Sequence, residues 1–264
     1  MQKSYAQDIV QTHDYTRYLV SLSAKSYAQK QALWALFAFN YEVARTREIV
    51  SDTTIGLIRL TWWRDALKAI YDMPTEHKRS LDDHPILPEL ADAIKTFALP
   101  YDLFDELLLG REFDLEDLQP ETLDGLITYI KNTNGPLLKL TARICGSQYS
   151  EIQLEKLASA NGLIGIISAV PYHAQHNIAM LPKENIDKDA IMSANTEKLV
   201  PTLSMICQEI QKLLKDIKQP PKGVIKSLYK LTKIHLHHIE KSGFDPTTTK
   251  FQKRPSFLAL KMSI

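Results

Sequence analysis

Residues 25–50 read KSYAQKQALWALFAFNYEVARTREIV, and this stretch decides the class of the fold. Its apolar side chains recur at steps of three and four residues, which is the period of an α-helix rather than the two-residue period of a strand. The positions that show this pattern are Leu33, Leu36, Phe37, Tyr41 and Ala44. The sequence therefore predicts a long helix over residues 25–50, with one face against a core.

The rest of the chain has the same helical character. Only 9 glycines occur in 264 residues, and residues that favour helices dominate. Further helices are expected over residues 54–71, 86–97, 101–115, 120–145, 150–171, 200–217 and 224–242. We expect residues 72–85 to form a loop, residues 172–189 to be irregular, and residues 254–264 to begin one more helix. The prediction is a single all-α domain over residues 1–264, an antiparallel helical bundle.

Composition excludes several classes of protein. An apolar fraction of 44% and a charged fraction of 24% indicate an ordinary globular protein with a sizeable core. A net charge of +1 argues against a nucleic-acid binder. Cys145 and Cys207 share no metal-binding spacing. Because no apolar run of about 18 residues is present, we expect a cytoplasmic protein, with the periphery of the inner membrane as a further location.

The charge is distributed unevenly. Residues 1–152 hold 16 Lys and Arg against 22 Asp and Glu, a charge of −6, and residues 153–264 hold 16 against 9, a charge of +7. In the basic half, four lysines form one stripe on the expected helix 224–242: Lys222, Lys226, Lys230 and Lys233. Such a stripe favours peripheral contact with anionic lipid. The alternative interpretation is the solvated face of an ordinary outer helix.

Five segments, in this order along the chain, provide a second signal. They are ALWALFAFNYEVARTRE (32–48), IRLTWWRDAL (58–67), LLLGREFDL (107–115), YIKNTNGPLLKLTARICG (129–146) and NGLIGIISAVPYHAQHNIAMLPKE (161–184). Together they resemble the squalene/phytoene synthase family over nearly the whole chain. This resemblance implies the all-α isoprenoid-synthase fold with a central cavity.

The same resemblance places two metal-binding motifs. Enzymes of the family bridge a diphosphate through Mg²⁺ to two DxxxD motifs, whose spacing puts both carboxylates on one helix face. The first motif falls on Ala44 and Glu48 and the second on His173 and Asn177, and Pro171 is expected to interrupt the second helix. Ala, His and Asn supply little of the oxygen charge that Mg²⁺ requires. We therefore expect no cofactor, and Mg²⁺ only if the protein is an active prenyl transferase.

Other residues are candidates for the site on weaker grounds. Asp114 and Arg64 also stand at family motif positions. The residues at these positions are candidates for lining the cavity: Ala44, Glu48, His173, Asn177, Asp114 and Arg64. Arg64 would contact an anionic head group or form a salt bridge with a neighbouring helix. Glu48 and Asp52, four residues apart, could hold a metal ion, although a solvated helix face explains them equally simply. No catalytic residue is predicted.

Two stretches, AFNYEVARTREIVSDTTIGLIRLTWWRDAL (38–67) and NGLIGIISAVPYH (161–173), most resemble one divergent subgroup of the family. This subgroup contains the mitochondrial respiratory complex I assembly factor and its alphaproteobacterial relatives, whose aspartate motifs have diverged. The resemblance implies a non-catalytic protein that acts in respiratory complex assembly, with respiratory-complex subunits as partners, or that binds a lipid-like or prenyl ligand. The alternative is an active prenyl transferase that condenses two prenyl diphosphates at a relocated Mg²⁺ site.

Overall fold

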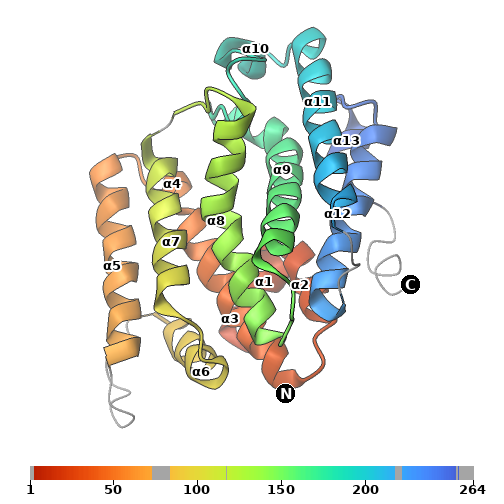
Figure 1. Cartoon of the computed structure of the whole chain (residues 1–264). Coiled ribbons are helices and arrows are strands. Elements are labelled where there is room, and N and C mark those ends of the chain that lie inside the picture. Colours follow the sequence, from red (N-terminus) through yellow and green to blue (C-terminus); the bar gives the residue numbers. More distant parts are fainter. Residues whose placement is uncertain (1–2, 73–83, 117, 218–221, 254, 256–264) are drawn as a thin grey trace. The chain divides into compact units, whose positions relative to one another are not determined.

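The computed structural model describes residues 3–72, 84–116, 118–217, 222–253 and 255. In this part of the chain every regular element is a helix, so the all-α prediction is confirmed (Figure 1). The chain divides into two compact units, each assembled from separate segments. The first unit contains residues 1–116, 136–149 and 222–225, and the second contains residues 117–135, 150–221 and 226–264.

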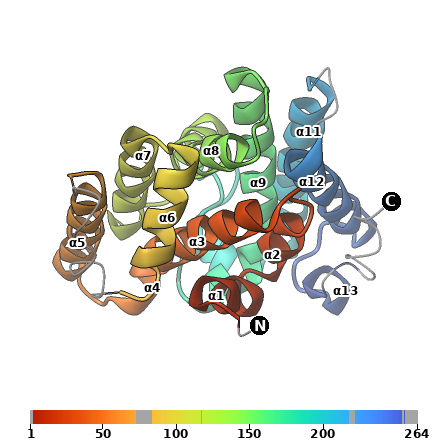
Figure 2. The ribbon, with the colours of Figure 1, turned by 90° about the horizontal axis from the view of Figure 1, so that it is seen from below.

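The first unit is built around α3 (Tyr27–Ala44), which is buried along almost every side. Helices α1 (Tyr5–His13), α2 (Tyr15–Ser21), α6 (Leu87–Phe97) and α7 (Tyr101–Glu112) pack against it (Figure 2). A short helix, α4 (Thr46–Ile49), leads to α5 (Thr53–Asp72), which packs on α7 and on the 3-10 helix η2 (Phe113–Glu116). The core contains edge-to-face contacts of Phe39 with Trp63 and with Phe104.

The second unit is built around α9 (Glu151–Gln175). Helix α9 packs against α11 (Thr196–Lys215), α10 (Lys188–Met192) and α13 (Thr249–Gln252). Helices α8 (Leu123–Ile144) and α12 (Gly223–Lys241) complete the chain, and each contributes residues to both units. Asn161 of α9 donates to the Thr232 hydroxyl of α12 at 3.2 Å, which ties these helices together inside the unit.

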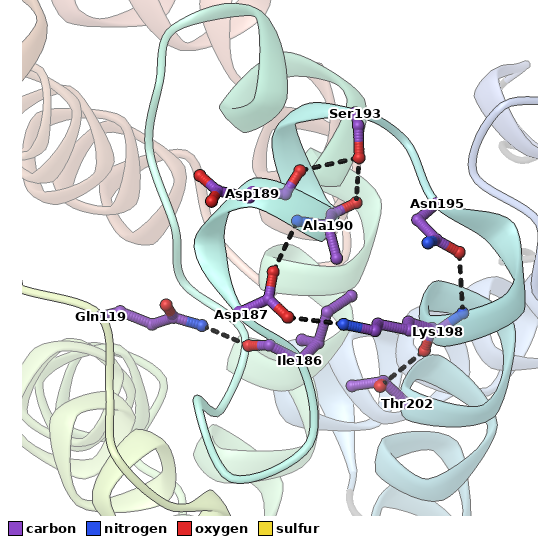
Figure 3. A network of polar contacts seen from close by, with 9 residues as sticks. All are labelled: Gln119, Ile186, Asp187, Asp189, Ala190, Ser193, Asn195, Lys198 and Thr202. Atoms are coloured by element: carbon purple, nitrogen blue, oxygen red, sulfur yellow. Dashed lines mark hydrogen bonds and ion pairs between the residues drawn. The ribbon is translucent and has the colours of Figure 1, made fainter.

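A network of polar contacts fixes the connection between α9 and α11 (Figure 3). Asp187 caps α10 by accepting from the Ala190 amide at 2.8 Å, and it pairs with Lys198 at 2.6 Å. Gln119 donates to the carbonyls of Leu181 and Ile186 at 2.9 and 2.7 Å. The connection, irregular by its sequence, is therefore held by specific hydrogen bonds.

Several helices begin or end at residues that differ from the predictions. The predicted helix 25–50 is two helices, α3 and α4, separated by the single capping residue Arg45. Helix α11 begins at Thr196 rather than Val200, because Asn195 caps it. Helices α1 and α2, which were not predicted, are capped by Ser4 and Asp14. Most of the predicted loop 72–85 and of the final helix 254–264 lies outside the described residues.

Pro171 does not interrupt α9, and this prediction was wrong. The helix continues through Pro171 to Gln175. A proline in a helix interior removes one amide hydrogen bond, but Ile167 and Val170 are buried and hold the preceding turn against the core. Among the described residues no helix is long and apolar enough to cross a membrane.

Candidate functional site

The first motif lies where α3 ends. Ala44 is the last residue of α3, and Arg45 follows it as the C-cap. Glu48 belongs to the separate helix α4 and is exposed. Ala44 and Glu48 therefore lie in different helices. A spacing of four residues places two side chains on one helix face only if the helix is continuous, so this pair does not form such a face.

Asp52 has a structural role at the next helix. Val50 is extended, so Glu48 and Asp52 are not one turn apart on a helix. The Asp52 carboxylate accepts from the amides of Thr54 at 2.8 Å and Ile55 at 3.2 Å, at the start of α5. The hydrogen bond from the Ile55 amide, followed by that from the Thr54 amide, lowers the pKa of Asp52. The carboxylate acts as a helix cap.

The second motif lies where α9 ends. His173 is in the last turn of α9, His176 is the C-cap, and Asn177 has a left-handed backbone with φ of 57°. The Ile178 amide donates to the His173 carbonyl at 2.9 Å, which closes the helix end. Asparagine adopts the left-handed conformation more readily than most residues. Asn177 therefore terminates the helix that carries His173.

The His176 side chain contacts Tyr172 in the last turn of the same helix. Its Nδ1 lies 2.8 Å from the Tyr172 carbonyl, and its ring stacks on the Tyr172 ring with centroids 4.0 Å apart. These contacts hold the imidazole against α9.

The residues at the motif positions do not fit a magnesium site of the DxxxD type. In each motif the helix ends between the two motif positions, so neither pair lies one turn apart on one helix. Alanine offers no ligand, and histidine and asparagine offer no carboxylate. Within the described ranges no group of three or more His, Cys, Asp or Glu side chains is placed to hold a metal ion.

An arginine stands beside the first motif. Asn40 precedes Ala44 by four residues on α3, and its Oδ1 accepts from the Arg111 guanidinium at 3.4 Å. The same guanidinium donates to Asp114 Oδ2 at 3.2 Å. The side chains of Arg111 and Asp114 are 12% and 9% exposed. Asp114 is therefore compensated by a cation of the protein itself.

A second buried carboxylate is compensated in the same way. Glu42, whose side chain is 7% exposed, pairs with Arg59 of α5 at 2.8 Å and with Arg45 at 3.5 Å. His84 lies in the electrostatic field of this group. Burial lowers the pKa of His84, Glu42 opposes the shift and Arg59 adds to it. The imidazole is therefore favoured in its neutral form.

Arg64 forms the salt bridge that was one of its two predicted roles. It pairs with Asp105 at 2.6 Å and Glu112 at 3.0 Å, which joins α5 to α7. Burial acts to lower the pKa of Arg64, but the hydrogen bonds and charges of the two carboxylates outweigh it and raise the pKa. Arg64 therefore has two anionic partners inside the protein.

The two cysteines are not reactive nucleophiles. Both are free thiols. Burial raises the pKa of Cys145 and of Cys207 to about 12. The thiolate, which is the nucleophilic form, is therefore scarce at neutral pH.

The lysine stripe of α12 lacks an exposed apolar side. Lys222, Lys226 and Lys233 are exposed, and Lys230 is half-buried. The apolar residues between them, Val224, Ile225, Leu228 and Leu231, belong to the core. Contact of this stripe with a membrane would therefore rest on charge alone.

Sequence reasoning missed the arginines that compensate the buried carboxylates. Arg111 and Asp114 are three residues apart, as are Glu42 and Arg45. This spacing is a recognised signal for an ion pair on one helix face. The pairing of Glu42 with Arg59 has no such local signal.

Comparison with known proteins identifies the architecture. The squalene/phytoene synthase family matches residues 10–257. A squalene synthase from Alicyclobacillus acidocaldarius superposes with a TM-score of 0.74 at 16% identity, over 91% of this chain and 94% of that one. A dehydrosqualene synthase superposes with a TM-score of 0.75 at 16% identity, over 98% and 92%. These likenesses establish the isoprenoid-synthase fold.

The similar curated proteins have a different description. NADH dehydrogenase (ubiquinone) complex I assembly factor 6 of Mus musculus is 29% identical over 203 residues, and that of Homo sapiens is 28% identical. In both comparisons the match covers 74% of this chain and 59% of the relative. A homologue from Dictyostelium discoideum is 26% identical over 66% of this chain and 48% of its own length. The chain thus spans about three-fifths of the mammalian relatives.

Proposed function

Because the chain belongs to the squalene/phytoene synthase family, we propose that it retains the family's fold without its metal-dependent prenyl transfer. Its function is to assist the assembly of a respiratory complex, with subunits of that complex as its partners. The central cavity that the family resemblance implies would then hold a lipid-like or prenyl ligand rather than a pair of reacting diphosphates.

One observation carries this proposal. Both helices that should present paired aspartates end between the two motif positions, at Ala44 and at Gln175. Restoring an aspartate at one position would not recreate the pair, because the second position lies beyond the helix end. The nearby carboxylate Asp114 already has the Arg111 guanidinium as its counter-charge. No magnesium is needed to neutralise it.

The assembly role itself is supported by the relatives. The similar curated proteins are described as complex I assembly factors, from mammals to Dictyostelium discoideum. The two solved enzyme structures are similar to this chain at 16% identity, which supports the fold and not an activity. The balance of these observations favours the assembly role over prenyl transfer.

The proposal is tested by deletion of the gene in its own host. We expect the deletion to lower the amount of assembled NADH dehydrogenase complex on a native gel, and the wild-type gene to restore it. Unchanged complex levels in the deletion strain would refute the assembly role.

A second experiment tests for prenyl transfer directly. Purified protein is incubated with farnesyl diphosphate or geranylgeranyl diphosphate and Mg²⁺, and released pyrophosphate is measured. We expect release at the level of the protein-free control, because neither pair of motif positions holds two carboxylates to bind the metal-bridged diphosphate. Turnover that Glu48→Ala abolishes would establish the alternative, an active transferase with a relocated Mg²⁺ site.

A further inference from the structure

Helix α5 exposes an apolar stripe on its outer side. Ile55 is 54% exposed, Ile58 is 64% exposed and Trp62 is 37% exposed. The three residues follow one another at steps of three and four, so they lie on one face of the helix. An apolar stripe at this spacing normally packs against another element. Here it faces outward.

Further apolar side chains are exposed on another face of α5 and on the elements packed beside it. Leu57 of α5 is 40% exposed, and Leu109 of α7 and Phe113 of η2 are each 53% exposed. Seven of the thirteen large apolar side chains that are exposed among the described residues lie in α4, α5, α7 and η2. We call the stripe Ile55, Ile58 and Trp62, together with the exposed apolar residues Leu57, Leu109 and Phe113 on other faces of these elements, the α5–α7 patch.

The α5–α7 patch lies on a rigid support. Arg64 joins α5 to α7 through Asp105 and Glu112. Gly56 is packed so closely on η2 that an added Cβ would lie 2.6 Å from a Leu115 methyl group. In both views α7 flanks α5 on one side, and no described helix of the same unit covers the opposite side (Figures 1 and 2). The patch is therefore surface, and not part of the core of its unit.

The charges around the patch determine what can cover it. The exposed charged residues of α5, α7 and η2 are five acids and one base: Asp65, Asp72, Asp102, Glu106 and Glu116, with Lys68. Such a rim repels a second copy of itself and an anionic lipid surface. It attracts a partner that combines apolar side chains with Lys or Arg.

We propose that the α5–α7 patch is the docking surface for a basic amphipathic helix of a partner protein. The partner helix lays its apolar residues, spaced at three and four, along Ile55, Ile58 and Trp62. Its Lys and Arg side chains meet the acidic rim. This inference rests on the proposed function and deepens it, because it states the chemistry of the partner that an assembly factor must bind.

The test uses the full chain and synthetic helical probes. A fluorescent peptide of about 18 residues, made of leucine and lysine in an amphipathic pattern, is titrated and its anisotropy is measured. A peptide with glutamate at every lysine and a scrambled leucine-lysine peptide serve as controls. We expect saturable binding of the amphipathic basic peptide only, and weaker binding as salt is raised.

Two matched variants locate the binding. Ile58→Ser removes the most exposed residue of the patch, and Ile152→Ser changes a side chain on α9 that is 67% exposed. Ile and Ser have similar helix propensities, so both variants are expected to keep their circular dichroism spectra. We expect Ile58→Ser to weaken peptide binding by about tenfold and Ile152→Ser to leave it unchanged. Equal effects of the two variants, or equal binding of the glutamate peptide, would overturn the proposal.

Other occupants give distinct results. The protein is also tested for self-association by sedimentation and for binding to anionic vesicles. If Ile58→Ser abolishes either the self-association or the vesicle binding, the proposal is wrong. In the deletion strain, Ile58→Ser is expected to restore complex assembly poorly, whereas Ile152→Ser restores it fully. If both variants restore assembly, the docking surface is wrong and the assembly role stands. If the deletion causes no defect, the assembly role fails, and the peptide titration still decides the chemistry of the patch.

Discussion

At the scale of single residues, Arg111 is a counter-charge of the buried Asp114 carboxylate. The pair lies beside Asn40 and is 12% and 9% exposed. We predict that Arg111→Leu lowers the free energy of unfolding by about 3 kcal/mol, because it removes the Arg111 cation from a carboxylate that is almost wholly buried. Urea unfolding followed by circular dichroism measures the change.

The control for this prediction is an exposed ion pair. Lys183 and Glu121 lie 3.1 Å apart with side chains 58% and 74% exposed. An exposed pair contributes at most about 1 kcal/mol, so Lys183→Leu should change the unfolding midpoint little. A similar loss of stability in both variants would contradict the importance of burial at Arg111.

At the scale of an element, α9 depends on one glycine for its packing. A Cβ at Gly162 would lie 2.3 Å from Ile130 Cγ2 and 2.9 Å from Asn134 Nδ2 of α8. Ile130 cannot swing aside easily, because a β-branched side chain has one preferred rotamer in a helix. We predict that Gly162→Ala destabilises the protein by about 2 kcal/mol, measured by urea unfolding.

The same helix supplies the matched control. A Cβ added at Gly165 would meet no neighbouring atom within 4 Å, and the backbone there is helical. Gly165→Ala is therefore expected to stabilise the protein by about 0.5–1 kcal/mol through helix propensity. If Gly162→Ala proved as stabilising as Gly165→Ala, the close approach of α8 and α9 would be refuted.

At the scale of the whole molecule, a half-buried histidine in each unit links stability to pH. Burial is the main influence that lowers the pKa of His84 in the first unit and of His235 in the second. Because the unfolded chain binds protons more readily, both contribute stability that is present above about pH 6.5 and is lost as the pH falls through the lower folded-state pKa.

We predict that the urea midpoint falls as the pH is lowered from about 7.5 to about 5.5. The double variant His84→Gln, His235→Gln should show a weaker dependence on pH in this window than the wild type. A dependence of equal size in the double variant would assign the effect to other groups.

Much of the fold could be predicted because its signals are local. The three- and four-residue spacing of Leu33, Leu36, Phe37 and Tyr41 is a property of neighbouring positions, and α3 follows it. The resemblance to the squalene/phytoene synthase family was confirmed by the match of that family to residues 10–257. Its signal, five segments in a fixed order, is also a property of the sequence alone. The ends of helices were predicted less well, because capping depends on backbone angles such as those of Arg45 and Asn177.

The sequence by itself determined the helical class and the family, because residue identity and spacing are enough to identify both. The loss of motif carboxylates stays a prediction from the resemblance. Only the tertiary structure decided that Ala44 and Glu48 belong to different helices and that Arg59 reaches Glu42 from 17 residues away. It also decided which side of α5 faces outward. An amphipathic pattern states that one face is apolar, but burial of that face depends on neighbours that are distant in sequence.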